Sequence, residues 1–295
     1  MKKQFKADIL LILITFFWGS SCLMTKIGLD EIQGFNLIAL RFIIAFLLSA
    51  SVFWKRFMTI NVKTVKYAAI LAGILSAVFV FMTFGVKYTT ASNAGFLTCL
   101  AGVFIPLILF ILLKQTPKIN VVISICLAFL GICLLSLNQQ LQFNKGDLLC
   151  ILCSLAFAVH IIATGILTRG VDSVSLGVLQ LGFVGVYSMI FSFIFENPKL
   201  PSTNQFWFTV LALSIFCTAI AFIVQTVAQK DTTSTHTGLI FSLEPVFAAI
   251  LAFIFAGEIL SIRGYLGAVI LIISILLVEF DFKYKFNNLK DVNCS

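Results

Sequence analysis

Apolar residues run through this sequence in long stretches separated by short polar loops. Ten stretches stand out, and each is long enough for a helix rising about 1.5 Å per residue to cross a hydrocarbon core about 30 Å thick. Strand-like alternation is missing, and helices satisfy their own backbone groups in lipid, so each stretch predicts a transmembrane helix. The predicted spans are residues 9–29, 36–54, 66–86, 91–113, 118–137, 146–166, 175–195, 205–229, 234–256 and 262–280.

Composition supports this interpretation. Of the 295 residues, 60% are hydrophobic and 11% are charged, and the mean hydropathy is +1.10. A soluble domain carries about a quarter charged residues, so this chain is predicted to be an all-α integral membrane protein. The first stretch is too long for a signal-peptide core and precedes no small-residue cleavage site, so it is expected to remain as the first helix.

Lysine and arginine are distributed unequally between the two sides of the predicted bundle. With the N-terminus inside, 14 of these residues fall on the inner side and 4 on the outer side. This bias predicts that both termini are cytoplasmic, and the short loops suit a bacterial inner membrane. The bias also accounts for the formal net charge of +8, which therefore gives no reason to expect a nucleic-acid partner. The four outer residues are Lys87, Lys145, Lys199 and Arg263.

The two halves of the chain resemble each other. A shift of 143 residues lays "TTASNAGFLTCLAGVF" (89–104) on "TTSTHTGLIFSLEPVF" (232–247), and a shift of 139 lays Arg41 on Gln180. Five spans per half is an odd number, so the second half must enter the membrane from the opposite side. The sequence thus predicts two inverted five-helix repeats, residues 1–140 and 141–285, followed by a cytoplasmic tail at 286–295.

Signals for catalysis or cofactor binding are missing. Seven of the eight cysteines lie in apolar stretches, where small packing residues are the simplest interpretation. The sequence contains no phosphate-binding GxxxxGK[ST] motif, no cluster with metal-ligand spacing, and no nucleophile with a readable base partner. We therefore expect no cofactor, no metal and no catalytic residue.

Glu244 is the most informative polar residue, because it lies near the middle of the stretch 234–256. An ionised carboxylate at that depth costs about 2.5–3.5 kcal/mol, which favours a wet cavity, a partner or protonation. Glu244 is therefore a candidate for substrate binding and proton coupling. Pro245 cannot donate to the carbonyl of Phe241, and Pro106 likewise frees the carbonyl of Gly102, so both prolines are predicted to interrupt their helices.

Other polar or aromatic residues inside the spans are candidates for substrate binding. Trp18 lies at mid-span, away from the interfacial positions that tryptophan favours, so it is expected either to stack on a substrate or to pack. Arg41 is expected to snorkel to headgroups or, alternatively, to pair with Glu244 or with a substrate carboxylate. The remaining candidates, each of which could instead bond a neighbouring helix, are Ser21, Asn93, His160 and Gln180.

Several motifs together resemble the EamA type of the drug/metabolite transporter superfamily. They are "WGSS" (18–21) with Lys26, "RF" (41–42), "YTTASNAGFLTCL" (88–100) and "SLEPVFAAILAFIFAGE" (242–258). The resemblance implies ten helices in two halves, with a substrate cavity lined by the first, third, fourth, sixth, eighth and ninth. The fifth and tenth helices, with few polar residues at mid-span, are expected outside. "FAVH" (157–160) departs from the family pattern on the sixth helix.

The resemblance implies transport of a small metabolite rather than catalysis. An aromatic-rich chain with few charges suits an amino acid or similar amphiphilic compound moved outward, with protons as a candidate coupling ion. The alternative is uptake of a nucleotide-like or sugar-phosphate metabolite, with Lys26 and Arg41 binding its anionic groups. An intramembrane enzyme or a non-transporting scaffold is the alternative of another class.

Overall fold

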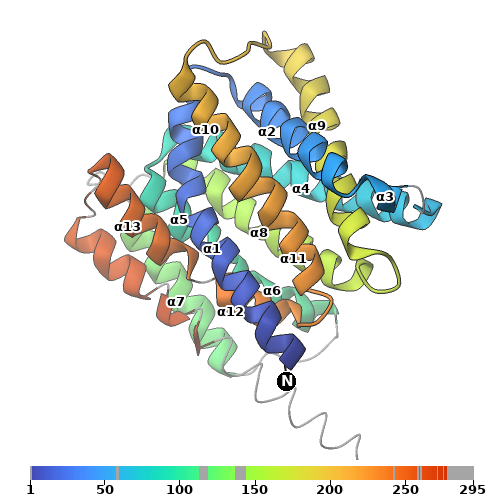
Figure 1. Cartoon of the computed structure of the whole chain (residues 1–295). Helices are drawn as coiled ribbons and strands as arrows, with labels where there is room; N and C mark the ends of the chain where they lie inside the picture. Colours follow the sequence, from blue (N-terminus) through green and yellow to red (C-terminus); the bar gives the residue numbers. More distant parts are fainter. Residues whose placement is uncertain are drawn as a thin grey trace, which may run out of the picture.

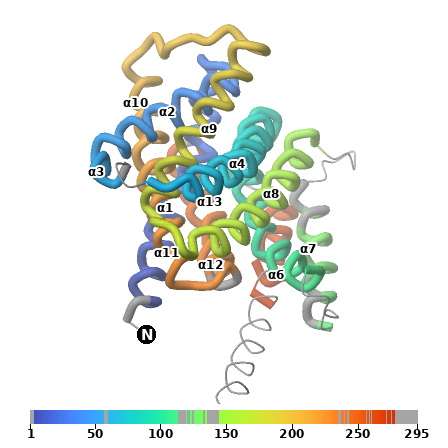
Figure 2. The backbone as a smooth tube through the Cα atoms, turned by 90° about the vertical axis from the view of Figure 1, so that its right-hand side faces the viewer, coloured from blue at the N-terminus to red at the C-terminus, as the bar shows by residue number. Residues whose placement is uncertain are grey.

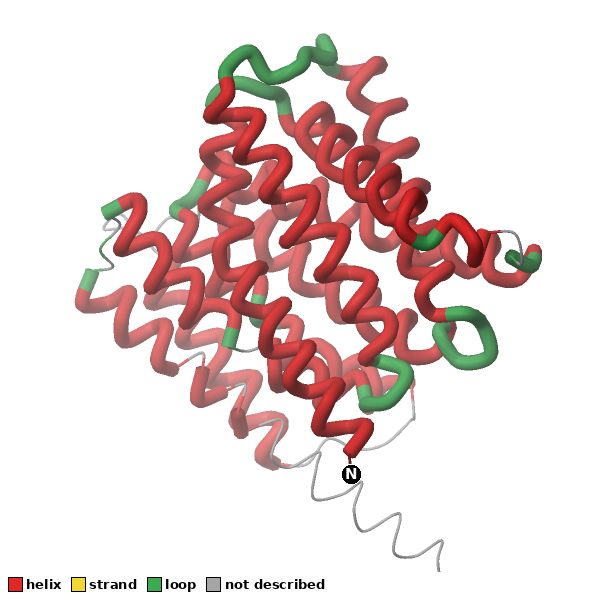
Figure 3. Tube along the Cα trace, viewed as in Figure 1, coloured by secondary structure: helices red, strands yellow, loops and turns green. Residues whose placement is uncertain are grey.

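The fold is helical throughout the part of the chain that the computed structural model describes, which covers residues 2–57, 60–112, 119–136, 144–241, 243–257, 259, 261–270, 272–274 and 276–277. Figure 3 shows these helices joined by short loops, and the described residues form no strand. The helices are α1 (Lys2–Leu29), α2 (Gly34–Val52), α3 (Trp54–Phe57), α4 (Val62–Tyr88), α5 (Ala91–Thr98), α6 (Ala101–Leu112), α7 (Ile119–Ser136), α8 (Lys145–Leu167), α9 (Ser173–Phe195), α10 (Asn204–Ser214), η1 (Ile215–Ile220), α11 (Ala221–Ala228), α12 (Ser234–Phe241) and α13 (Glu244–Ala256).

The chain is a multi-pass membrane protein. Within the described residues, seven helical segments are long and apolar enough to cross a membrane, and the number of ten spans remains a prediction. The short helix α3 was not predicted, and the tail at 286–295 lies outside the described residues. The seven segments are Gln4–Leu29, Gly34–Val52, Val62–Tyr88, Ala91–Leu112, Lys145–Leu167, Ser173–Phe195 and Asn204–Ala228.

Helices from the two halves of the sequence pack against each other. Figure 1 shows α1 running from the N-terminus through the bundle beside α10 and α11, which come from the second half. In Figure 2, α4 lies along α8, and α2 packs extensively on α9. The halves therefore interlock, and the core contains side chains from both.

Two predicted helices are broken near their centres. The stretch 91–113 is divided into α5 and α6, and the stretch 234–256 into α12 and α13. A shift of 143 residues carries α5 onto α12 and the first residue of α6 onto the first residue of α13. The two interruptions therefore occupy equivalent places in the two halves of the sequence.

The two prolines relate differently to these breaks. Pro245 is the second residue of α13, directly after the interruption, where its missing N–H costs no helical bond. Pro106 instead lies inside α6, so the prediction that it marks the break of the fourth span is wrong. That break is at Cys99 and Leu100, where the tighter bonds Leu100 N–H to Leu97 O and Gly102 N–H to Cys99 O replace the helical pattern.

The eighth predicted span is not a uniform α-helix. Residues Ile215–Ile220 form a π-helical turn, η1, between α10 and α11. A side-chain hydrogen bond accompanies this turn. The hydroxyl of Thr218 donates to the carbonyl of Leu213, five residues earlier, at 2.8 Å. A π-turn contains one extra residue, so it leaves backbone groups available to other helices, and such turns are frequent at functional sites.

Polar contacts join one end of α9 to α2 and the other end to α3. At one end the Glu196 carboxylate accepts the backbone N–H groups of Phe35 and Asn36, at 2.9 and 2.8 Å. At the other end Arg56 donates to Asp172 at 2.8 Å, and Asp172 also caps α9. Burial raises the pKa of Asp172, but hydrogen bonds from Ser175 and the nearby Arg56 charge outweigh burial and keep the pKa below its ordinary value.

A glycine allows α1 to approach α13 closely. A Cβ atom added at Gly19 would lie 2.6 Å from the Cβ of Phe247 and 3.0 Å from the backbone nitrogen of Ala248. A Cβ added at Gly95 of α5 would lie 2.8 Å from the Cβ of Ala248. Small residues therefore hold α1 and α5 against α13, as expected for helices packed in lipid.

Substitution of Gly19 tests this close approach. Gly19→Ala should destabilise the protein by about 1–3 kcal/mol, because backbone atoms of α13 cannot move aside as a flexible side chain would. Gly73→Ala is the matched control, since an added Cβ at Gly73 of α4 meets nothing within 4 Å. Equilibrium unfolding in detergent micelles measures both variants, and equal stability for the two would contradict the packing described.

Candidate functional site

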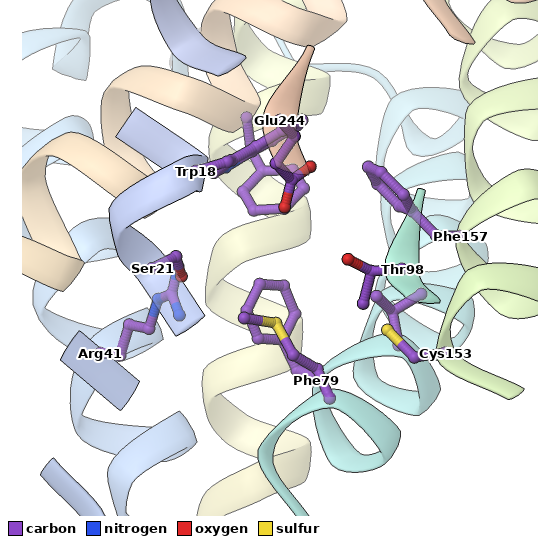
Figure 4. Close-up of a pocket in the computed structure, with 11 residues that line it drawn as sticks. Trp18, Ser21, Arg41, Phe79, Thr98, Cys153, Phe157 and Glu244 are labelled. Atoms are coloured by element: carbon purple, nitrogen blue, oxygen red, sulfur yellow. The ribbon is translucent and has the colours of Figure 1, made fainter. Parts of the chain in front are cut away.

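A pocket lies at the centre of the bundle, with a cavity volume of about 40 Å³. Figure 4 shows its lining converging from several helices. The six spans expected to line a cavity each contribute a residue, and α2 adds Arg41. The lining residues are Trp18, Ser21, Arg41, Val78, Phe79, Met82, Thr98, Cys153, Phe157, Phe222 and Glu244.

The pocket lies against both helix breaks. Thr98 is the last residue of α5 and Glu244 is the first residue of α13, and both side chains line it. The backbone at a helix break needs hydrogen-bond partners inside a membrane, and such backbone is tolerated where it is buried in protein or lines a cavity. The breaks therefore position polar groups at the depth of the pocket.

Glu244 lies at a helix N-terminus and faces this pocket. Its side chain is 9% exposed, and it forms no hydrogen bond or ion pair with any residue in the described part of the chain. The N-terminal end of a helix carries partial positive charge, so α13 favours an anionic group at this position. A carboxyl group in this setting is available to a ligand or a proton.

The π-turn η1 anchors two of the residues that line the pocket. The carbonyl of Cys217 accepts the indole N–H of Trp18 at 3.0 Å and an N–H of Arg41 Nη2 at 3.1 Å. The Nε–H of Arg41 donates to the hydroxyl of Thr218. One turn of backbone therefore fixes an aromatic ring from α1 and a guanidinium from α2.

Arg41 is buried rather than extended toward headgroups, so the prediction that it snorkels is wrong. Its side chain is only 3% exposed, and its guanidinium carbon lies 4.7 Å from the centre of the Phe79 ring. The hydrogen bonds to η1 explain this placement, because they draw the side chain inward. No described carboxylate lies within ion-pairing distance of Arg41, so a direct pair with Glu244 is also not formed.

Aromatic rings form much of the pocket wall. Two contacting pairs of rings consist of residues at equivalent positions in the two halves of the sequence. Trp18 and Phe157, related by the shift of 139 residues, meet edge to face at 5.6 Å between ring centroids. Phe79 and Phe222, related by the shift of 143, meet in the same way at 5.7 Å. Each pair joins one residue from each half of the sequence, so both halves contribute to the aromatic wall of the pocket.

Ser21 follows Trp18 by one helical turn and lines the same pocket. Its side chain is 2% exposed, and its hydroxyl has no hydrogen-bond partner among the described residues. A buried hydroxyl without a partner is costly, and this cost is removed when a ligand or a water molecule occupies the adjacent space.

His160 and Gln180 form a separate buried cluster outside this pocket. His160 Nε2 lies 3.3 Å from the side-chain oxygen Oε1 of Gln180. The side-chain nitrogen Nε2 of Gln180 donates to the hydroxyl of Thr226 at 3.2 Å. Both residues therefore link α8, α9 and α11. This agrees with the alternative that they bond neighbouring helices instead of binding a substrate. His160 still contacts the pocket wall, since its ring stacks on Phe157.

Asn93 also lies outside the pocket, in the first turn of α5, five residues before Thr98. Sequence reasoning did not single out Thr98, Cys217, Thr218 or Phe222. The adjacent pair Cys217–Thr218 in the middle of an apolar stretch was the available signal for the π-turn. Among the described residues, no group of three or more His, Cys, Asp or Glu side chains could hold a metal ion.

These features define a class: a multi-span helical membrane protein with broken helices and a polar group at a central pocket. Comparison with known sequences makes the family specific. The profile of the EamA-like transporter family matches residues 5–137 and again residues 144–280, so the chain belongs to this family. The chain is therefore a membrane transporter rather than an enzyme, and the family profile recurs once in each half.

Individual relatives agree with this assignment. An uncharacterized transporter of Archaeoglobus fulgidus is 30% identical over 94% of this chain and 87% of its own length. The uncharacterized transporter YetK of Bacillus subtilis is 24% identical over 90% of this chain and 84% of its own length. A solved crystal structure superposes with a TM-score of 0.67 at 19% identity, covering 92% of this chain and 96% of that chain, which supports the fold.

Replacement of Trp18 tests the link between α1 and the π-turn. Trp18→Phe retains an aromatic ring but loses the hydrogen bond to Cys217, which should destabilise the protein by about 0.5–1.5 kcal/mol. Trp54→Phe is the control, because Trp54 is 56% exposed and contributes less to the fold. Unfolding in detergent micelles measures both, and unchanged stability of Trp18→Phe would indicate that the indole N–H contributes little.

Proposed function

We propose that this protein exports a small zwitterionic metabolite of the amino-acid type by alternating access at the central pocket. The observation that carries this proposal is a pocket with a carboxyl group on α13 and a guanidinium on α2, separated by aromatic wall. Figure 4 places Glu244 and Arg41 at different ends of the pocket. An amino acid presents an ammonium and a carboxylate to such a site, and its side chain suits the apolar wall.

Alternating access requires two conformations of similar free energy, and inverted repeats provide a route to them. We propose that residues 1–140 and 141–285 form two inverted five-helix repeats. The equivalent breaks of α5–α6 and α12–α13 support this arrangement, as do the two aromatic pairs that join equivalent positions of the two halves. The substrate would then bind where both halves contribute to its surroundings.

The alternative substrate, a nucleotide-like or sugar-phosphate metabolite, needs more positive charge in the pocket. Of the two cations considered for that role, Arg41 lines the pocket and Lys26 does not. A single guanidinium opposite a carboxyl group suits a monoanionic carboxylate better than a phosphate ester with about two negative charges at neutral pH. We therefore favour the zwitterion.

Glu244 is proposed as the proton carrier. It is a buried carboxyl group, it lines the pocket, and it forms no ion pair with a described residue that would hold it in one charge state. Binding of an ammonium group would favour the carboxylate, and release of that group would favour its protonation. Such competition couples substrate movement to proton movement in opposite directions.

A proteoliposome assay tests substrate and coupling together. Vesicles carrying the protein should transport at least one radiolabelled member of a panel of the standard amino acids, and an imposed pH gradient should change the rate. Glu244→Gln should lose this dependence on the gradient because its side chain carries no exchangeable charge. Asp231→Asn, at an exposed loop position, should retain it. Transport by Glu244→Gln with an unaltered gradient response would exclude Glu244 as the carrier.

Membrane topology provides an independent test of the inverted repeats. Reporter fusions at residue 143, between the halves, should indicate an external position, whereas fusions at both termini should indicate the cytoplasm, because each half contains an odd number of spans. A cytoplasmic signal at residue 143 together with cytoplasmic termini would mean that each half has an even number of spans. The inverted arrangement would then be abandoned.

A further inference from the structure

The pocket contains a buried positive charge that forms no direct ion pair with a described residue. Arg41 is almost wholly buried, and no described carboxylate lies within ion-pairing distance of it. Burying an unpaired charge costs several kcal/mol even after local relaxation. A buried cation that faces a pocket is therefore most stable when a ligand brings an anionic group to it.

The guanidinium also has hydrogen-bonding capacity to spare. It offers five N–H donors in a fixed planar fork. The described residues accept two of them, because Nε donates to Thr218 and Nη2 donates once to the carbonyl of Cys217. The two N–H groups of Nη1 and one of Nη2 remain, and a parallel pair, one N–H from each of these nitrogens, matches the two oxygens of a carboxylate.

The π-turn holds the guanidinium in a defined orientation. Thr218 is itself fixed, since its hydroxyl donates to the carbonyl of Leu213 while accepting from Arg41. The Phe79 ring covers one face of the guanidinium. Two hydrogen bonds and one ring contact leave the Arg41 guanidinium little rotational freedom. Little further side-chain entropy is therefore lost when a ligand binds to it.

Ser21 completes the arrangement. Trp18 and Arg41 donate to the same carbonyl of Cys217, so α1 and the guanidinium are close at this level. Ser21 lies three residues after Trp18 and therefore on the same face of α1. Its hydroxyl has no described partner, and Figure 4 shows Ser21 and Arg41 on the same side of the pocket.

We infer that Arg41 and Ser21, positioned by Thr218 and Cys217 of the π-turn, form a subsite for a carboxylate group. The inference rests on the proposed function in that this carboxylate belongs to the transported molecule. Arg41 contributes two parallel N–H bonds and Ser21 one O–H bond. Thr218 acts through Arg41 and is a positioning residue.

Binding of simple carboxylates tests the subsite without any transport step. The full chain with Trp54→Phe and Trp207→Phe, in detergent micelles, leaves Trp18 as the single tryptophan, and Trp18 lines the pocket. The probes are 3-phenylpropionate and its neutral amide, which have nearly the same shape. The carboxylate should change Trp18 emission at a concentration at least tenfold lower than the amide. Equal concentrations for the two probes would overturn the inference.

Variants assign the effect to the proposed residues. Arg41→Gln should raise the concentration needed for the carboxylate to that of the amide, whereas Arg169→Gln, in an exposed loop, should not. Ser21→Ala should weaken carboxylate binding several-fold with no change for the amide, and Ser51→Ala on the exposed surface is its control. If Arg41→Gln does not fold, Ser21→Ala decides, and unchanged carboxylate binding there contradicts the subsite.

Thr218 separates positioning from a general structural role. Thr218→Val removes the hydroxyl at nearly constant volume and should weaken the carboxylate several-fold, while Thr218→Ser should restore it. Equal binding by both variants would contradict positioning. The outcomes are independent of transport: carboxylate binding without amino-acid transport would overturn only the proposed function, and amino-acid transport without a preference for the carboxylate probe would overturn only the subsite.

Discussion

The backbone carbonyl of Cys217 accepts hydrogen bonds from two other helices at the centre of this protein. This carbonyl lies in the π-turn and accepts the indole N–H of Trp18 and a guanidinium N–H of Arg41. In lipid an unused backbone acceptor costs several kcal/mol, so a carbonyl at this depth must be paired. Its two partners come from α1 and α2 in the first half, whereas the turn belongs to the second. A local irregularity in one helix thereby ties three helices together and places a charge beside the pocket.

Around that carbonyl, the two halves of the sequence contribute similar aromatic residues but different polar residues. Trp18 meets its counterpart Phe157, and Phe79 meets Phe222, so the aromatic wall is shared between the halves. The polar residues do not follow this relation. The shift of 143 carries Ala101 onto Glu244, and the shift of 139 carries Arg41 onto Gln180 and Ser21 onto His160. Both halves therefore contribute to the pocket and its helix breaks, whereas Glu244 and Arg41 each lack a charged counterpart in the other half.

Much of the fold was readable from the sequence because length and hydropathy determine membrane helices. Seven of the ten predicted spans follow from that pattern among the described residues. The interruption next to Pro245 and the pocket position of Glu244 follow from a proline and a carboxyl group placed inside an apolar stretch. Arg41 was placed wrongly because snorkelling depends only on depth, whereas its actual position depends on a carbonyl presented by a distant helix. The π-turn itself was missed because one extra residue in an apolar stretch leaves the hydropathy unchanged. Pro106 was wrongly predicted to interrupt its helix, because a proline lowers the free-energy cost of a break without determining where the break occurs.

The asymmetry of the polar residues has a consequence for a carrier built, as we propose, from two inverted repeats. Two equivalent repeats, if they exchange conformations, would produce inward-facing and outward-facing states of nearly equal free energy. Charged residues present in only one half remove that equality, because Glu244 and Arg41 have different surroundings in the two states. Their free energy in each state depends on whether a ligand neutralises them, since an unpaired buried charge is costly. Under our proposal, substrate and proton occupancy therefore shift the balance between the two states, and the substrate and proton gradients set the direction of net transport.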